Sequence, residues 1–206
     1  MMAPFSTANY FASLIGNLSI CAIPIIITSI SGPENTAYYA VAMSYASLLF
    51  SIPISICNSL FAEGAANEQE IMKSSLKAVR LICILLFPAI TVLLVFGENA
   101  LLFFGVDYAR HSTYLLSLLA VSSIFVAINT VCWTLLNLIH RVPDIIVALS
   151  LNTILILILT YLWTPRGLLG TGLAWIVGQG VTSLIYVLLV FKRIFWGKFL
   201  WRSIGL

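Results

Sequence analysis

The chain has 206 residues, of which 61% are hydrophobic and only 8% are charged. A soluble domain carries about 25% charged residues, so this composition excludes a soluble globular protein and predicts an integral membrane protein. The net charge of +3 gives no indication of a nucleic-acid partner.

The hydrophobic residues fall into six blocks, each long enough to cross a bilayer. A membrane helix needs about 20 apolar residues, whereas a barrel strand needs about 10 with alternating polarity. The blocks have the helical length and show no alternation. We therefore predict one all-α, polytopic transmembrane domain over residues 1–206, with spans at about 10–30, 37–61, 81–104, 113–139, 145–163 and 169–191.

The polar residues deep within these blocks are neutral, and three blocks contain a proline. The first block carries Asn17 and Pro24, the second Pro53 and Asn58, and the third Pro88. A proline removes a backbone donor and kinks or loosens a helix. The simplest role for an amide at this depth is a hydrogen bond between helices, worth about 0.6–2 kcal/mol. Later blocks add the amides Asn129, Asn137, Asn152 and Gln179.

Between the second and third blocks, residues 67–80 are predicted to form an amphipathic helix along the cytoplasmic membrane surface. Asn67 and Glu70 have the spacing of a capping box, and Lys73, Lys77 and Arg80 recur every three or four residues. The acidic residue suits the N-terminal end of the helix dipole, and the basic residues suit its C-terminal end.

The last block contains small residues at every fourth position: Gly170, Ala174 and Gly178. In membranes such a ridge lets two helices approach backbone to backbone. We therefore expect these three residues to form a helix-packing surface.

The basic residues predict the orientation of the chain. Six spans put both termini on one side, and Arg110 and Arg166 are the only basic residues expected on the other side. Positive charge collects on the cytoplasmic side, so both termini are predicted to be cytoplasmic, in a multi-pass protein of the cell membrane. The predicted cytoplasmic residues are Lys73, Lys77, Arg80, Arg141, Lys192, Arg193, Lys198 and Arg202.

Residues that support catalysis or metal binding are scattered along the chain. His111 and His140 are expected on opposite sides of the membrane, and each of the four cysteines lies in a different block, where we expect a small, buried thiol. No known catalytic motif occurs, and no Asp, Glu, Lys or Arg lies in the middle of a block. We therefore expect no enzymatic activity, metal or cofactor, and no self-contained proton relay.

Three stretches, taken together and in order, resemble polysaccharide and oligosaccharide flippases of the multidrug/oligosaccharidyl-lipid/polysaccharide exporter superfamily. The first, AYYAVAMSYASLLFSIPISICNSLFAEGA at 37–65, resembles the second span of a repeat unit, although its exit LFAE lacks the family's proline. The second is LVFGENALLFFGVDYARHSTYLLSLLA at 94–120, and the third is the Gly-rich PRGLLGTGLAWIVGQGV at 165–181.

This resemblance implies two six-helix halves, related by an axis along the membrane normal, that rock around a central cavity. The chain has the length of one half and looks like the C-terminal one. Either two copies pair, a second chain supplies the other half, or the gene is truncated. The resemblance further implies that Pro24, Pro53 and Pro88 act as hinges and that Asn17, Asn58 and Asn129 face the cavity.

The function expected from the resemblance is the flipping or export of a lipid-linked oligosaccharide or polysaccharide precursor by alternating access. The sugar would pass through the cavity while its lipid tail stays among the membrane lipids. Two alternatives remain open at this point. The chain is half of a drug or cation-coupled exporter of the same superfamily, or it is a non-transporting membrane scaffold or truncated remnant.

Overall fold

The computed structural model of the chain describes residues 3–66 and 71–203, and their side chains over residues 14–62 and 73–192. The described ranges are helical apart from short links and contain no strand. They form α1 (Ala3–Ser31), α2 (Pro33–Ala66), α3 (Ile71–Leu102), α4 (Val106–Leu138), α5 (Val142–Trp163), the 3-10 turn η2 (Thr164–Arg166) and α6 (Leu168–Ser203).

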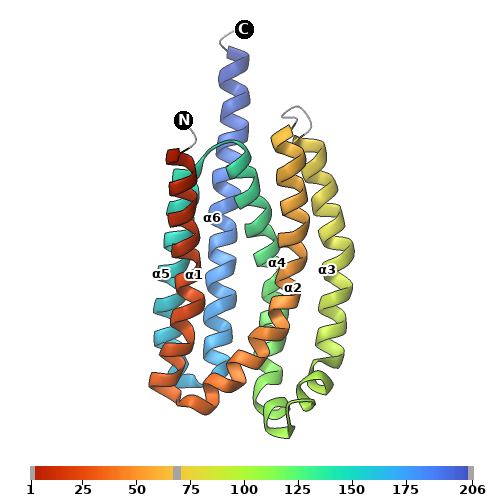
Figure 1. The fold of residues 1–206 in the computed structure, drawn as a ribbon, viewed down its shortest axis with the longest axis vertical. Helices are drawn as coiled ribbons and strands as arrows, with labels where there is room; N and C mark the ends of the chain where they lie inside the picture. Colours follow the sequence, from red (N-terminus) through yellow and green to blue (C-terminus); the bar gives the residue numbers. More distant parts are fainter. Residues whose placement is uncertain (1–2, 67–70, 204–206) are drawn as a thin grey trace.

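Each of the six α-helices in the described ranges is long and apolar enough to cross a membrane. The predicted all-α, polytopic fold is therefore confirmed. Because the number of spans is even, the start of α1 and the end of α6 lie at the same end of the bundle (Figure 1). We call this the terminal end, and the opposite end the loop end.

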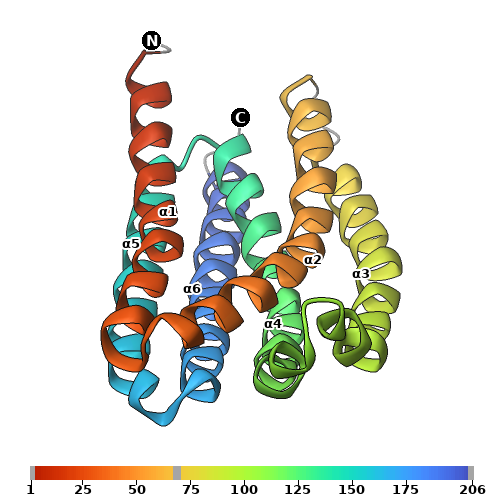
Figure 2. The ribbon, with the colours of Figure 1, turned by 60° about the horizontal axis from the view of Figure 1, so that its bottom comes forward.

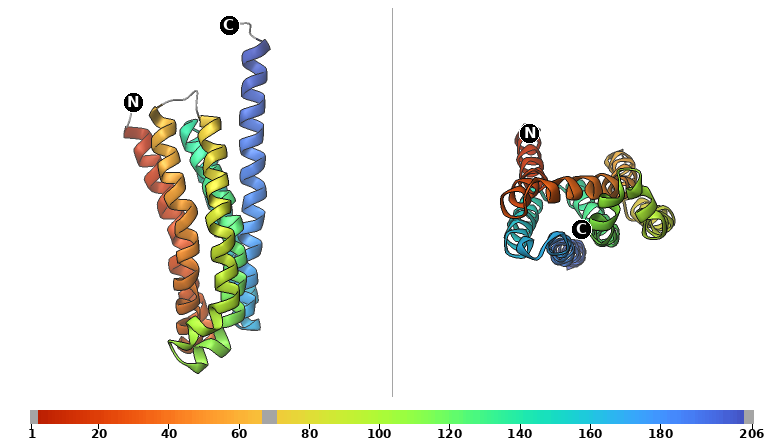
Figure 3. Two further views of the ribbon diagram at one scale, coloured as in Figure 1. Left: turned by 90° about the vertical axis from the view of Figure 1, so that its right-hand side faces the viewer. Right: turned by 90° about the horizontal axis from the view of Figure 1, so that it is seen from below.

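Helix α4 lies at the centre of the bundle and packs against α2, α3 and α6. Helix α1 packs mainly against α5 and α2, and α5 packs in turn against α6. Viewed along the bundle, α1 and α2 lie on one side, while α5, α6 and α4 form the other (Figure 3).

The links between helices are short, which fixes neighbouring helices as antiparallel pairs. Gly32 alone separates α1 from α2; its φ of 87° is accessible to glycine at little cost, and Pro33 begins the next helix. At the end of α4, the Arg141 amide donates to the Leu136 carbonyl at 2.8 Å and the His140 amide to the Asn137 carbonyl at 3.0 Å. These two bonds form a Schellman motif, with His140 at φ 56° where glycine is usual.

Helix α2 is visibly bent: its first part runs obliquely across the bundle and its second part runs along it (Figure 2). Pro53 lies within this helix and donates no bond to the carbonyl one turn earlier. Serine hydroxyls also bond back to the helix backbone, with Ser44 donating to the Ala40 carbonyl at 2.8 Å and Ser51 to the Leu48 carbonyl at 2.7 Å. Back-bonding of this kind often bends helices, so both features contribute to the shape of α2.

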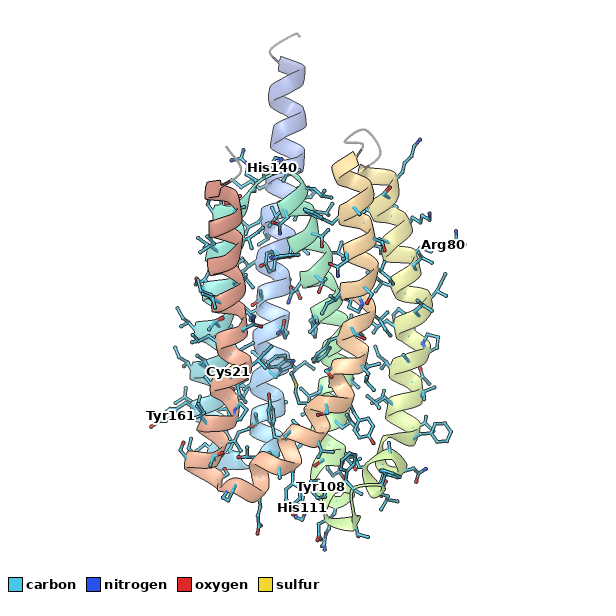
Figure 4. All side chains as sticks on the ribbon, in the orientation of Figure 1. Cys21, Arg80, Tyr108, His111, His140 and Tyr161 are labelled. Atoms are coloured by element: carbon cyan, nitrogen blue, oxygen red, sulfur yellow. The ribbon has the colours of Figure 1, made fainter. Side chains whose placement is uncertain are left out.

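The surface helix predicted at 67–80 does not form as a separate element. Residues 67–70 lie outside the described part of the chain, and residues 71–80 are the first turns of α3, which continues without a break to Leu102. Helix extension costs less than starting a new helix, and no glycine or proline interrupts the chain between 71 and 87. The basic residues therefore lie along the terminal part of a span, where the labelled Arg80 projects outward (Figure 4).

The small residues at the start of α6 lie close to α5 and its link. A Cβ atom added to Gly178 would overlap Cγ1 of Ile156 on α5, and one added to Gly170 would overlap the Trp163 carbonyl. Ala174, between them, is fully buried. Close approach of α5 and α6 therefore requires small side chains at these positions.

Replacing Gly178 by Ala should lower the free energy of unfolding by about 1–3 kcal/mol, because the added methyl group overfills the α5–α6 contact. Unfolding of the purified protein by increasing SDS in mixed micelles measures this change. Gly180→Ala is the matched control, since its Cβ would meet Phe125 at an ordinary 3.8 Å. Equal stability of the two variants would contradict this packing.

Candidate functional site

A cavity of about 430 Å³ lies inside the bundle, toward the terminal end. It occupies the space between the α1–α2 side and the α4–α5–α6 side. Helix α3 contributes no residue to it. Its lining consists of Gly16, Asn17, Ile54, Cys57, Asn58, Val126, Asn129, Thr130, Trp133, Thr134, Leu149, Asn152, Gln179, Thr182 and Tyr186.

Each of the five helices around the cavity contributes one carboxamide side chain. The three residues that the sequence predicts to face a cavity, Asn17, Asn58 and Asn129, come from α1, α2 and α4 and all lie in this lining. Asn152 of α5 and Gln179 of α6 complete the set. Sequence reasoning assigned these last two only to helix packing. Their signal was present, however, because each is an amide deep within an apolar block.

Two hydrogen bonds tie cavity residues together across helices. Asn129 Nδ2 donates to Gln179 Oε1 at 2.8 Å and lies 3.3 Å from the Gln179 carbonyl, which joins α4 to α6. Thr182 Oγ1 donates to Asn152 Oδ1 at 2.8 Å, which joins α6 to α5. The carboxamides of α4, α5 and α6 are therefore held in fixed positions. By contrast, Asn17 and Asn58 are exposed and bond to no described residue.

Two polar atoms of lining residues are buried without a hydrogen-bond partner. They are Oδ1 of Asn129 and the hydroxyl of Tyr186, a residue that is only 2% exposed. A buried polar atom without a partner costs about 1–3 kcal/mol, and most such atoms in proteins are paired with protein or water. The cavity wall therefore has hydrogen-bonding capacity that the described part of the chain does not use.

On the loop side of the cavity, large apolar side chains fill the bundle. Phe50 of α2 and Trp175 of α6 are stacked with ring centroids 6.3 Å apart and planes 18° apart. Each lies one turn from a cavity residue on its own helix. Ile23, Ile27 and Ile156 are fully buried in the same cluster. We call these five residues the apolar floor; the cavity's polar walls end at it.

Among the residues whose side chains the structure describes, the lining includes no Asp, Glu, Lys, Arg or His. Amides, hydroxyls and one indole supply its polarity, so the site can donate and accept hydrogen bonds but offers no formal charge. In a low-dielectric membrane environment, this distinction favours neutral polar ligands over ions.

The three predicted hinge prolines lie at different places relative to the cavity. Pro53 is buried and directly precedes the lining residue Ile54, so a change in its helix would move the wall. Pro24 is half-buried on α1, beyond Asn17 toward the loop end, and Thr28 Oγ1 donates to its carbonyl at 2.8 Å. Pro88 is exposed on α3, away from the cavity. A hinge role for these residues stays a prediction.

Other chemically reactive residues do not converge on the cavity. His111 lies at the loop end and His140 at the terminal end (Figure 4). No group of three His, Cys, Asp or Glu residues suited to a metal occurs in the described part of the chain. The expectation of buried thiols is right for Cys57 and Cys132 but wrong for Cys21 and Cys83, which are exposed on the outer surface of their helices.

No protein-family model, curated protein or solved structure gives a significant match to this chain.

The Asn129–Gln179 pair should have a measurable coupling energy. In a double-mutant cycle with Asn129→Ala and Gln179→Ala, we expect a coupling of about 0.6–2 kcal/mol in the free energy of unfolding, because each single change leaves a polar atom unpaired. SDS titration in mixed micelles gives the four stabilities. Asn17→Ala is the control and should change stability by less than about 0.5 kcal/mol, since its amide is exposed. Additive effects of the two changes would contradict the contact.

Proposed function

We propose that the chain is one lobe of a transporter that moves lipid-linked saccharide precursors across the cell membrane by alternating access. The observation that supports this most is the cavity with five carboxamides, one from each of five spanning helices. Sugars present many hydroxyl groups, which both donate and accept hydrogen bonds, and carboxamides do the same. A cavity open within the membrane would let the head group pass while the apolar tail stays in lipid.

The neutrality of the lining favours this substrate over the alternatives from the same superfamily. Transporters that couple to protons or cations usually keep an ionisable group at membrane depth, because the ion must be bound there. The polar groups of this lining are mainly amides and hydroxyls instead. The order of sequence motifs also agrees better with the polysaccharide branch than with the drug-exporting branch.

A second six-helix lobe is part of the proposal, because one face of α2 is unsuited to lipid. Five polar residues recur every three or four positions along this helix and are all exposed: Ser44, Ser47, Ser51, Ser55 and Asn58. We call them the α2 polar stripe. The outer faces of α3, α5 and α6 carry large apolar residues instead, such as Val95, Ile154 and Leu188. Lipid against the stripe would leave the Asn58 amide unpaired, whereas a second lobe or a water-filled pathway would satisfy it.

The proposed orientation puts the terminal end in the cytoplasm. Lys73, Lys77 and Arg141 gather at this end, whereas Arg110 and Arg166 at the loop end are accompanied by Glu34, Glu98 and Asp107. Positive charge on the cytoplasmic side agrees with this orientation. The cavity would then be offered to precursors made inside the cell.

A cysteine on the α2 polar stripe should cross-link two copies of the chain. We expect Ser51→Cys, with the exposed Cys21 and Cys83 replaced by Ala, to form a disulfide-linked dimer in membranes treated with copper phenanthroline. Ile154→Cys, on the lipid-facing surface of α5, is the matched control and should stay monomeric. Equal dimer yields from the two positions would show that the stripe does not face a second copy.

The purified chain, reconstituted in lipid vesicles, should speed the movement of a fluorescent lipid-linked oligosaccharide between leaflets. The expected result is a rate above that of protein-free vesicles, measured as the fraction of head groups that an external glycosidase can cleave over time. A fluorescent phosphatidylcholine in the same vesicles is the control and should not move faster. No acceleration by a preparation that contains cross-linked dimers would count against transport.

A further inference from the structure

We infer that the cavity is a head-group subsite that selects an uncharged sugar residue and rejects acidic and basic sugars. The inference deepens the proposed function, on which it rests for the identity of the ligand as the head of a membrane lipid. The structure carries it through three features: the chemistry of the lining, the lack of countercharge and the position of the two unpaired amides.

The lining matches the hydrogen-bonding pattern of neutral sugar hydroxyls. A carboxamide presents a donor and an acceptor side by side, and neighbouring hydroxyls on a sugar ring present the same combination. Around this cavity such groups come from five directions, with the Thr130, Thr134 and Tyr186 hydroxyls between them. Asn129 Oδ1 and the Tyr186 hydroxyl are buried behind this surface, so the groups that a ligand meets first are the exposed amides of Asn17 and Asn58.

A charged head group would lose its water in this site without gaining a countercharge. No lining residue is acidic or basic, and the basic residues of α3 lie on a helix that contributes nothing to the cavity. Burying an unpaired charge is far more costly than burying a hydroxyl with hydrogen-bond partners. The volume of about 430 Å³ is within the range of sites for small ligands, so a sugar residue can enter far enough to meet this penalty.

Asn17 of α1 and Asn58 of α2 lie on the same side of the cavity and are the members of the set that a ligand meets unpaired. Both are exposed, and neither bonds to a described residue. Asn129 and Gln179 are instead bonded to one another deeper in the wall. Replacement of Asn58 therefore changes the ligand-binding surface without breaking a hydrogen bond that holds helices together.

Three probes with one tail and different heads test this selectivity. They are octyl glucoside (neutral), octyl glucuronide (anionic) and octyl glucosaminide at a pH where its amine is protonated (cationic), added below micelle-forming concentrations to the full chain in nanodiscs. Binding is followed by tryptophan fluorescence, since Trp133 lines the cavity, and Trp133→Phe should remove the signal. We expect the neutral head to bind at least about tenfold more tightly than either charged head, equivalent to about 1.4 kcal/mol.

A single added charge should abolish the preference for the neutral head over the cationic head. With Asn58→Asp, the cationic head should gain about tenfold in affinity relative to the neutral head, because the carboxylate supplies the missing countercharge. Ser59→Asp is the matched control: it adds the same charge at the adjacent exposed position, which does not line the cavity, and the neutral preference should persist.

Equal affinities for the three heads, a preference for a charged head, or no saturable signal from any of them would overturn the inference. An equal gain in relative affinity for the cationic head in Asn58→Asp and in Ser59→Asp would also overturn it. These outcomes are separate from the transport test. If the chain flips a lipid-linked oligosaccharide but binds the three heads without selectivity, the inference is wrong and the proposed function stands. If it binds the neutral head selectively but does not flip the lipid, transport is wrong and the subsite stands.

Discussion

The membrane allows no polar group to face hydrocarbon without a partner, and this constraint organises the molecule. Helices α3, α5 and α6 present large apolar side chains outward, and the amides of the spans are turned toward the interior or toward the α2 side. Five carboxamides from five helices therefore meet in one cavity, although they are up to 162 positions apart in the chain. The helices that approach most closely do so through small residues, so the polar groups need not occupy the tightest contacts.

Hydrogen bonds join the two sides of the bundle around the cavity. Thr153 Oγ1 donates to the Ile15 carbonyl at 3.0 Å, which fixes α1 to α5, and Ser112 Oγ donates to the Tyr38 carbonyl at 3.1 Å, which fixes α2 to α4 near the loop end. Helix α2 is also packed toward the terminal end, where Cys57 and Leu60 are buried. Ser183 Oγ, which donates to the Phe125 carbonyl at 3.1 Å, helps keep α4 against α6. Side-chain hydrogen bonds therefore join α4 to α6, α1 to α5 and α2 to α4.

The sequence predicts the parts of this structure that depend on local pattern. Six apolar blocks of spanning length predict six helices, and amides such as Asn17 and Asn58 in those blocks indicate polar positions at depth. The sequence does not predict the features that depend on contacts between residues far apart in the chain. Asn152 and Gln179 reach the cavity because of how α5 and α6 rotate against α4, and no periodicity within either helix specifies that rotation. The error at residues 67–80 has the same origin, since an amphipathic pattern does not say whether a helix bends at the membrane surface or continues into it.

The apolar floor joins α2 to α6 on the loop side of the cavity. Phe50 and Trp175 bring α2 and α6 together through stacked rings, and no hydrogen bond between described residues of these two helices accompanies the stack. Dispersion contacts weaken gradually with separation, whereas a broken hydrogen bond in a low-dielectric interior leaves polar atoms exposed to hydrocarbon. The direct contact between α2 and α6 at the floor therefore depends on packing. Pro53 lies three residues from Phe50 and beside the cavity wall, so the same helix carries the bend, one residue of the apolar floor and the polar stripe.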